Sequence, residues 1–256
     1  TGELSLNANT TGGNNTATGA GSLEFSTTGN RNTATGANSL HANTTGDDNV
    51  AIGYESLKNS TTGIKNVAIG NYSMDALTTG NENTGVGYSA LGANTTGINN
   101  NAIGYFALSS NTTGGYNAAF GNSSMNANTT GDNNIAIGHL SLTANTTGTR
   151  NIALGSGALD APDTENDNLA IGYDALGGSI AGGEFNVAIG NYSMDALTSG
   201  DKNIAVGYNA LTASTTASNN TAVGYNALVA NTSGIGNTAI GYKSGDVITT
   251  GGSNGE

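Results

Sequence analysis

The sequence predicts an all-β fold, a parallel β-solenoid in which each repeat of the chain forms one coil. Three observations lead to this prediction. A glycine recurs every 17 residues, an asparagine stands four residues before it in every copy, and apolar residues occur at two fixed offsets from it. A helical fold is disfavoured, because Gly and Asn are frequent and the apolar residues do not follow the i, i+3, i+4, i+7 pattern.

The repeat reads N-x-A-I-G-Y-x-A-L-x-x-N-T-T-G-x-x and fills residues 1–256 as a single repeat domain of about 15 coils. Every step between repeat glycines is 17 residues, except the step of 18 residues between Gly172 and Gly190. At a spacing of about 4.8 Å per coil, the stack is expected to form a rod roughly 70 Å long. The stretch NVAIGNYSMDALT occurs at 66–78 and again at 186–198, which indicates duplication of a block of several coils.

The asparagine before each repeat glycine is predicted to form a corner of the coil. Asn tolerates the left-handed backbone region, and identical amides stacked in register form a hydrogen-bonded ladder. The predicted ladder consists of Asn49, Asn66, Asn83, Asn100, Asn117, Asn134, Asn151, Asn168, Asn186, Asn203, Asn220 and Asn237.

Two apolar columns are predicted to form the core. One lies directly before the repeat glycine, as at Ile52, and the other lies four residues after it, as at Leu57. Each coil is expected to hold two short strands, one through VAI and one near SL, separated by glycine and NTTG turns. Because this core is thin, we expect further burial against identical copies, with a homotrimer as the natural closed arrangement of a rod.

The stretches NVAIGYESL, NNAIGYFAL and NIAIGHLSL resemble the head repeats of trimeric autotransporter adhesins of the YadA type. They also resemble the NTAIGYxAL…NTTG arrays of phage tail fibres and related bacterial surface fibres. The resemblance covers almost the whole chain and implies a trimeric, left-handed parallel β-roll. The unit of YadA-type heads is shorter, so the additional NTTG turn implies a different outline of the roll.

Composition narrows the possible functions. The net charge is −12, which disfavours binding to nucleic acid because an acidic surface repels phosphate. No apolar run approaches the length of a membrane span, so we expect no membrane insertion by this segment. His41 and His139 occupy variable columns without a nucleophile and acid beside them, and we therefore expect no enzymatic activity.

Two atypical turns stand out, at 160–168 and 177–185. The first carries a group of carboxylates that could bind Ca²⁺ through oxygen ligands, although a variable surface turn without any cofactor is the better interpretation. These carboxylates belong to Asp160, Asp163, Glu165 and Asp167. The second turn holds the one inserted residue, and is either a ligand site or a drifted repeat.

Exposed columns are the remaining candidates for binding. Tyrosine follows the repeat glycine in many copies and suits either a subunit interface or contact with a glycan or protein. These positions are Tyr54, Tyr88, Tyr105, Tyr173, Tyr208, Tyr225 and Tyr242. Thr pairs such as Thr44 and Thr45 place one Thr per coil outward, an arrangement that some ice-binding solenoids use.

We therefore expect a structural or adhesive segment of an extracellular fibre, from a bacterial surface adhesin or a phage-type tail fibre. Its expected partners are two further copies of itself and, in the adhesive role, a glycan or protein of a host surface. Two alternatives stay open: a passive spacer with binding in flanking domains, and an ice-binding solenoid that uses the Thr column.

Overall fold

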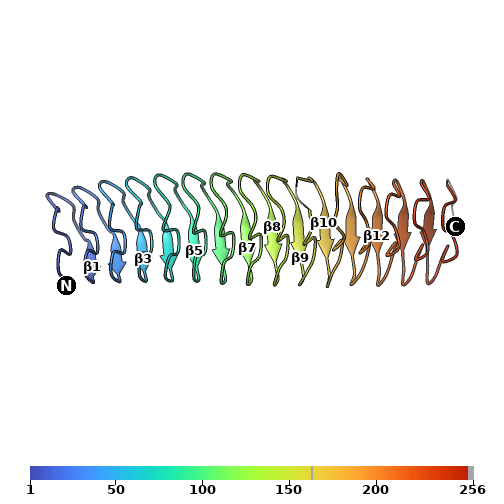
Figure 1. Cartoon of the computed structure of the whole chain (residues 1–256), viewed down its shortest axis with the longest axis horizontal. Helices are drawn as coiled ribbons and strands as arrows, with labels where there is room; N and C mark the ends of the chain where they lie inside the picture. Colours follow the sequence, from blue (N-terminus) through green and yellow to red (C-terminus); the bar gives the residue numbers. More distant parts are fainter. Residues whose placement is uncertain (163, 253–256) are drawn as a thin grey trace. The chain divides into compact units, whose positions relative to one another are not determined.

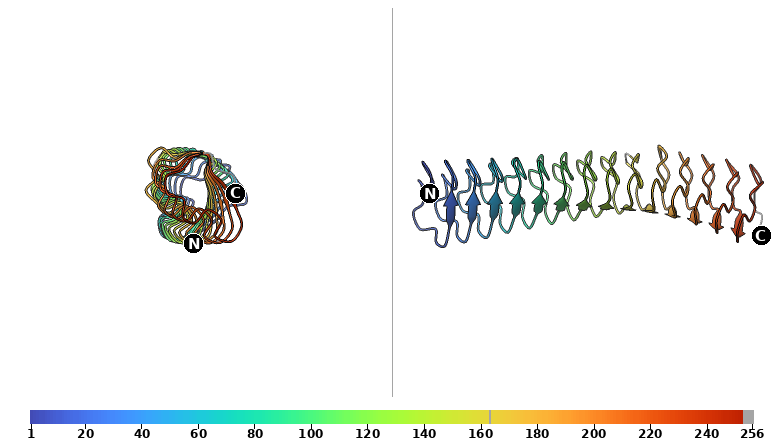
Figure 2. Two further views of the ribbon diagram at one scale, coloured as in Figure 1. Left: turned by 90° about the vertical axis from the view of Figure 1, so that its right-hand side faces the viewer. Right: turned by 90° about the horizontal axis from the view of Figure 1, so that it is seen from below.

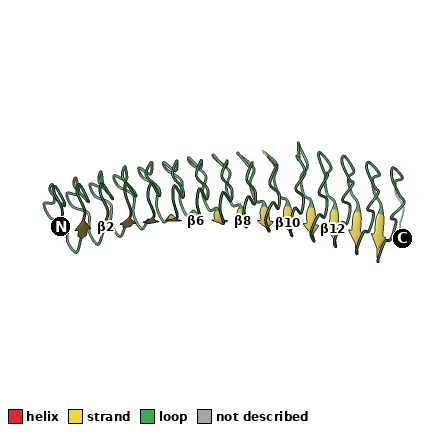
Figure 3. Cartoon of the chain, turned by 60° about the horizontal axis from the view of Figure 1, so that its bottom comes forward, coloured by secondary structure: helices red, strands yellow, loops and turns green. Residues whose placement is uncertain are grey.

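The computed structural model describes residues 1–162 and 164–252, which form two compact units, Thr1–Thr130 and Gly131–Glu256. In each unit the chain winds as a parallel β-solenoid, and the described residues contain no helix (Figure 1, Figure 3). Consequently none of them forms a helix of the length and hydropathy that spans a bilayer. The predicted all-β solenoid is confirmed.

Each coil contributes one strand of three residues, and these strands lie on one side of the winding chain in each unit (Figure 3). The strands of Thr1–Thr130 are β1 (Thr16–Thr18), β2 (Thr33–Thr35), β3 (Val50–Ile52), β4 (Val67–Ile69), β5 (Thr84–Val86), β6 (Asn101–Ile103) and β7 (Ala118–Phe120). Those of Gly131–Glu256 are β8 (Ile135–Ile137), β9 (Ile152–Leu154), β10 (Leu169–Ile171), β11 (Val187–Ile189), β12 (Ile204–Val206), β13 (Thr221–Val223) and β14 (Thr238–Ile240).

Within each unit, neighbouring strands pair in parallel and in register, as the coils follow one another along the chain (Figure 2). Ala51 pairs with Ala68, 17 residues further on. Between β10 and β11, Ala170 pairs with Ala188, so the inserted residue is absorbed in the turn and the strands stay aligned. The 17-residue period therefore corresponds to one turn of the solenoid.

The second strand predicted near SL is wrong, because this segment bends instead of extending. Glu55, Leu57 and Lys65 have φ values of 55°, 49° and 56°, and the equivalent residues of most other coils are also in the left-handed region. Their N–H groups bond to the neighbouring coil, as the Leu57 N–H does to the Ser73 carbonyl at 3.0 Å. These hydrogen bonds offset the backbone strain of three left-handed residues per coil.

The repeat glycine is required by both its backbone angle and its surroundings. Gly53 has a φ of 134°, and a Cβ atom placed on it would lie 2.5 Å from the carbonyl oxygen of Gly70 in the next coil. Any side chain would therefore push the coils apart, which explains why glycine recurs at this position.

The interior is filled by the Leu and Met residues four positions after the repeat glycine, together with the central Ala of every strand except β5. Leu57, Met74 and Leu108 are fully buried, which confirms this core column. The column before the glycine does not belong to the core of the chain: Ile52 is 39% exposed, and Ile103 is 46% exposed. That part of the core prediction is wrong.

The amide ladder at the coil corner is confirmed. The side-chain oxygen of Asn32 accepts hydrogen bonds from the Asn49 backbone N–H at 2.9 Å and from its amide nitrogen at 3.2 Å. The same amide nitrogen donates to the carbonyl of Gly63 at 2.8 Å. The left-handed backbone expected for the corner Asn is not found there, however. The residue with a positive φ is Asp48, which directly precedes Asn49.

A second buried ladder was missed in the sequence, where the Asn of NTTG looks like an ordinary turn residue. The side-chain oxygen of Asn43 accepts from the Gly46 N–H, and its amide donates to the Gly46 carbonyl, both at 3.1 Å. In neighbouring coils the Asn111 amide donates to the Asn94 side-chain oxygen at 3.2 Å. The position tolerates substitution, because Leu77 is fully buried in the same column.

We predict that Asn66→Ala destabilises Thr1–Thr130 by about 2–5 kcal/mol, because it leaves several buried polar groups unpaired. The lost side-chain bonds reach Asn49, Gly80 and Asn83. Thermal unfolding followed by circular dichroism measures the effect. The matched control is Asn101→Ala, which removes an exposed Asn from strand β6. Equal midpoints for the two variants would contradict a structural role of the ladder.

Candidate interaction surfaces

The first and third residues of each strand point away from the interior, and on most strands they are apolar. The inward middle residue is Ala in every strand except β5, where Gly85 replaces it. The interior is narrow there, since a Cβ on Gly85 would lie 2.7 Å from the Ser73 hydroxyl oxygen. Large residues such as Ile52 and Ile69 are therefore placed on the outer face.

We call these outward side chains the apolar sheet face. In Thr1–Thr130 it consists of Val50, Ile52, Val67, Ile69, Val86, Ile103, Ala118 and Phe120. In Gly131–Glu256 it consists of Ile135, Ile137, Ile152, Leu154, Leu169, Ile171, Val187, Ile189, Ile204, Val206, Val223 and Ile240. Strands β1 and β2 carry Thr instead, so the face begins at β3.

The predicted tyrosines form a column of exposed rings in each unit, and neighbouring rings touch. In Gly131–Glu256 the centroids of Tyr208 and Tyr225 lie 5.5 Å apart with an interplanar angle of 10°. Tyr225 and Tyr242 have the same separation and an angle of 13°. In Thr1–Thr130, Tyr88 stacks on Tyr105 at 5.5 Å. The structure thus brings the predicted residues together along each unit.

The aromatic column also includes three residues outside the predicted tyrosine positions: Tyr72, Phe106 and Tyr192. The Tyr72 ring lies between Tyr54 and Tyr88, with centroids 5.4 and 5.7 Å away. In this coil Asn71 takes the usual tyrosine position, and its side-chain oxygen accepts the Tyr54 backbone N–H at 3.0 Å. In both copies of NVAIGNYSMDALT, Asn-Tyr replaces the usual pair of Tyr and a variable residue. This exchange is the sequence signal that places Tyr72 and Tyr192 in the column.

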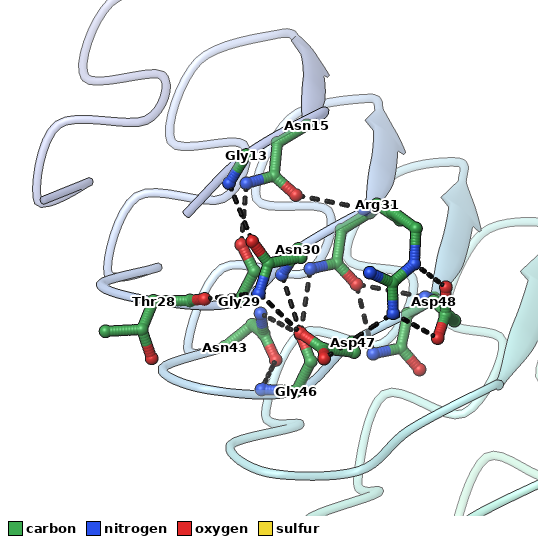
Figure 4. Close-up of polar contacts among 12 residues, drawn as sticks. Gly13, Asn15, Thr28, Gly29, Asn30, Arg31, Asn43, Gly46, Asp47 and Asp48 are labelled. Carbon is green, nitrogen blue, oxygen red and sulfur yellow. Dashed lines mark hydrogen bonds and ion pairs between the residues drawn. The ribbon is translucent and has the colours of Figure 1, made fainter. Parts of the chain in front are cut away.

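Side chains on the coil surface also link adjacent turns (Figure 4). The Asn30 side-chain oxygen accepts the Gly13 N–H at 2.9 Å, while the Asn30 N–H donates to Asp47 at 2.7 Å. Arg31 donates two hydrogen bonds to the Asp48 carboxylate, at 2.5 and 2.8 Å. Exposed pairs of this kind contribute little to stability.

The carboxylates considered for Ca²⁺ are engaged in different interactions, and Asp163 lies outside the described residues. Asp167 accepts two hydrogen bonds from Arg150, at 2.6 and 2.7 Å. The buried Glu165 accepts the N–H groups of Thr164 at 3.0 Å and of Gly182 at 2.8 Å. These contacts engage the carboxylates of Asp167 and Glu165 within the protein itself.

The two atypical turns, 160–168 and 177–185, are bonded to each other. Glu165 replaces the glycine of the NTTG turn and binds Gly182 in the inserted turn. Asn166 donates to the Glu184 carboxylate at 2.8 Å. Ile180 occupies the buried position of the second Asn ladder and is 2% exposed. The inserted residue is therefore accommodated by a matching change in the preceding coil.

Three aspartates near these turns, Asp160, Asp174 and Asp195, affect one another through their charges. Burial raises the pKa of Asp160, and the charges of Asp174 and Asp195 raise it further. The pKa of Asp195 is raised by burial and by Asp174. By contrast, the hydrogen bonds from Arg150 lower the pKa of Asp167. Acidic side chains in this region therefore affect stability with opposite signs.

We predict that Asp160→Asn raises the thermal midpoint at neutral pH. Folding raises the Asp160 pKa. At pH values between the unfolded and folded pKa, the folded chain therefore binds more protons than the unfolded chain. Its stability falls as pH rises through this interval. The amide removes that penalty, and the advantage should disappear below the unfolded pKa. Midpoints of both proteins measured between pH 3 and 8 test this.

Asp167→Asn is the control of opposite sign for this pH series. Its carboxylate has a lowered pKa, so it stabilises the fold above the unfolded pKa and loses that contribution as pH falls through the folded pKa. The variant should have a lower midpoint than the parent at neutral pH. A lower midpoint for Asp160→Asn as well would contradict the assigned sign.

The described residues present surfaces instead of a cavity. No pocket is found in residues 1–162 and 164–252. In the same residues, no three His, Asp or Glu side chains are grouped so as to hold a metal ion. Comparison with family models, curated proteins and solved structures finds no match to this chain.

Proposed function

We propose that this chain is a segment of an extracellular fibre in which three copies associate through their apolar sheet faces. The observation that carries the proposal is this exposed face, formed by Val50 to Phe120 in one unit and by Ile135 to Ile240 in the other. Monomeric soluble proteins rarely expose a contiguous apolar surface of this extent, and such surfaces mark interfaces.

A further copy of the same chain is the occupant that this face fits best. Its side chains recur with the spacing of the coils, so an identical face offers apolar residues at the same intervals. Neighbouring side chains such as Ile52 and Ile69 form flat rows, to which a partner with the same repeat is complementary. Three copies arranged about an axis direct all three faces inward and leave no face exposed.

The resemblance to trimeric adhesin heads and tail fibres supports the threefold arrangement and the left-handed β-roll. In such an assembly the turns and aromatic columns are displayed three times along the fibre. Weak contacts with a host-surface glycan or protein then add through multivalency. A passive spacer would have the same interface without this binding, so contact of the isolated chain with glycans or cells distinguishes the two roles.

We predict that the chain has three times its 25.2 kDa monomer mass in solution. Replacing Ile52 and Ile69 together by Lys should reduce this to the monomer mass, because it places charges in the interface. The two side chains point outward, so the coil should remain folded. Light scattering measures the mass, and circular dichroism verifies the fold.

Thr45→Lys combined with Thr62→Lys is the matched control, since these exposed residues lie in the TTG turns and outside the sheet. This variant should keep the parent mass. A parent chain that is monomeric and folded would overturn the proposed association. A parent dimer would retain the interface but contradict the threefold arrangement.

A second function is favoured by the Thr column of Thr1–Thr130. The hydroxyl of the first Thr of a pair is hydrogen-bonded to the next coil, as the Thr44 hydroxyl donates to the Thr61 carbonyl at 3.0 Å. The second Thr of the pair is exposed. The exposed residues are Thr11, Thr28, Thr45, Thr62, Thr79, Thr96, Thr113 and Thr130. Such a regular row offers hydroxyl and methyl groups to an ice surface.

Ice binding predicts thermal hysteresis, the difference between the melting and freezing points of a seeded solution. Thr62→Lys combined with Thr79→Lys should abolish it by disrupting the row, whereas the double Lys variant at Ile52 and Ile69 should retain it. If the parent chain shows no hysteresis at millimolar concentration, this second function is excluded.

A further inference from the structure

The exposed aromatic column has a geometry that suits covalent coupling between neighbouring tyrosines. We propose that this column is an oxidative cross-linking site, at which a haem peroxidase with hydrogen peroxide joins adjacent coils by dityrosine bonds. The proposal rests on the ring contacts and exposure of the tyrosines within each unit. It does not depend on the oligomeric state of the chain.

The tyrosines are the exposed side chains that lose an electron most readily in this chain. The sequence contains no Cys and no Trp, and it has three Met residues. All three, Met74, Met125 and Met194, are fully buried in the core column. A one-electron oxidant that acts on the protein surface is therefore directed to tyrosine, not to sulfur or indole.

The best pairs are in Gly131–Glu256, where Tyr208, Tyr225 and Tyr242 stack in sequence. Both pairs have centroids 5.5 Å apart, with interplanar angles of 10° and 13°. The three side chains are 43%, 46% and 73% exposed, so an oxidant can reach them and the rings have room to tilt. Their backbones are held in adjacent coils, where the Lys243 N–H bonds to the Tyr225 carbonyl at 2.9 Å.

The coupling balances in atoms and electrons. The peroxidase removes one electron and one proton from each of two phenols, giving two phenoxyl radicals, and reduces one hydrogen peroxide to two waters. The radical is shared with the ring carbons next to the C–OH carbon, the Cε atoms. Two Cε atoms join, and the hydrogens on these carbons move to the oxygens, which restores both aromatic rings.

The product ties residues that are 17 positions apart in the sequence but neighbours in the stack. A covalent link between successive coils restricts the unfolded chain, as a disulfide does, and opposes separation of the coils. The rings already meet in the folded chain, so the bond requires little rearrangement. Oxidation is thus expected to strengthen the solenoid, where in many proteins it causes damage.

The test treats the purified full chain with horseradish peroxidase and hydrogen peroxide, then identifies cross-linked peptides by mass spectrometry. We expect peptides that join Tyr208 to Tyr225 and Tyr225 to Tyr242, together with dityrosine fluorescence. A mixture of ¹⁵N-labelled and unlabelled chains distinguishes bonds within one chain from bonds between chains. Within one chain, both halves of each peptide carry the same label.

Tyr225→Phe keeps the stacked ring but cannot form a phenoxyl radical, so both of these peptides should be lost completely. Tyr116→Phe is the matched control, because Tyr116 is 58% exposed and touches no other aromatic ring among the described residues. It should leave the yield unchanged. The oxidised parent chain should also unfold at a higher temperature than the oxidised Tyr225→Phe variant.

Three results would overturn the proposal. The first is the absence of dityrosine in a chain whose circular dichroism shows it to be folded, which would mean that the column is covered or its rings cannot couple. The second is coupling at Tyr116 as fast as within the column. The third is a set of cross-linked peptides that carry mixed labels, which would place the reaction between chains.

Discussion

The amide ladder at the coil corner is the interaction on which the rest of this fold depends. Each corner Asn accepts from the next Asn and donates both to the preceding one and to a turn carbonyl, as Asn49 does with Asn32 and Gly63. Asp has no donor for these bonds, and the Ser side chain is too short to span them. Because the ladder is buried and continuous within each unit, it fixes the register of successive coils. A strand of only three residues per coil is then sufficient.

The interior that this corner helps to define is narrow, and its width determines which side chains of the strands lie on the outer face. Beside the strands there is space only for Ala or Gly, so the large residues that flank Ala51 point outward. The core consists of the column that contains Leu57, whose left-handed backbone turns it inward. The same geometry therefore produces a thin core and an apolar sheet face in each unit. These two properties are the physical basis of the proposed association with further copies.

The atypical turns show how such a repeat tolerates change. The inserted residue between Gly172 and Gly190 lies in a turn, where Glu165 of the preceding coil binds the inserted loop. The corner ladder continues across it, with the Asn186 N–H bonded to the Asn168 side chain at 3.0 Å. Each coil interacts mainly with its neighbours, so a local departure needs only local compensation. The aromatic column follows the same rule, since Tyr72 fills the place that Asn71 leaves.

The sequence by itself determined the repeat, the solenoid, the corner ladder and the Leu and Met core column, because each depends on a residue type that recurs at one offset. Alternation along VAI also showed that Val50 and Ile52 share a face. Which face points inward was decided only by the tertiary structure, since it depends on the width of the roll beside Ala51. The left-handed backbone at Leu57, where a strand was expected, depends likewise on hydrogen bonds to the next coil. Contacts between coils join residues 17 positions apart, and local pattern alone does not show how those residues meet.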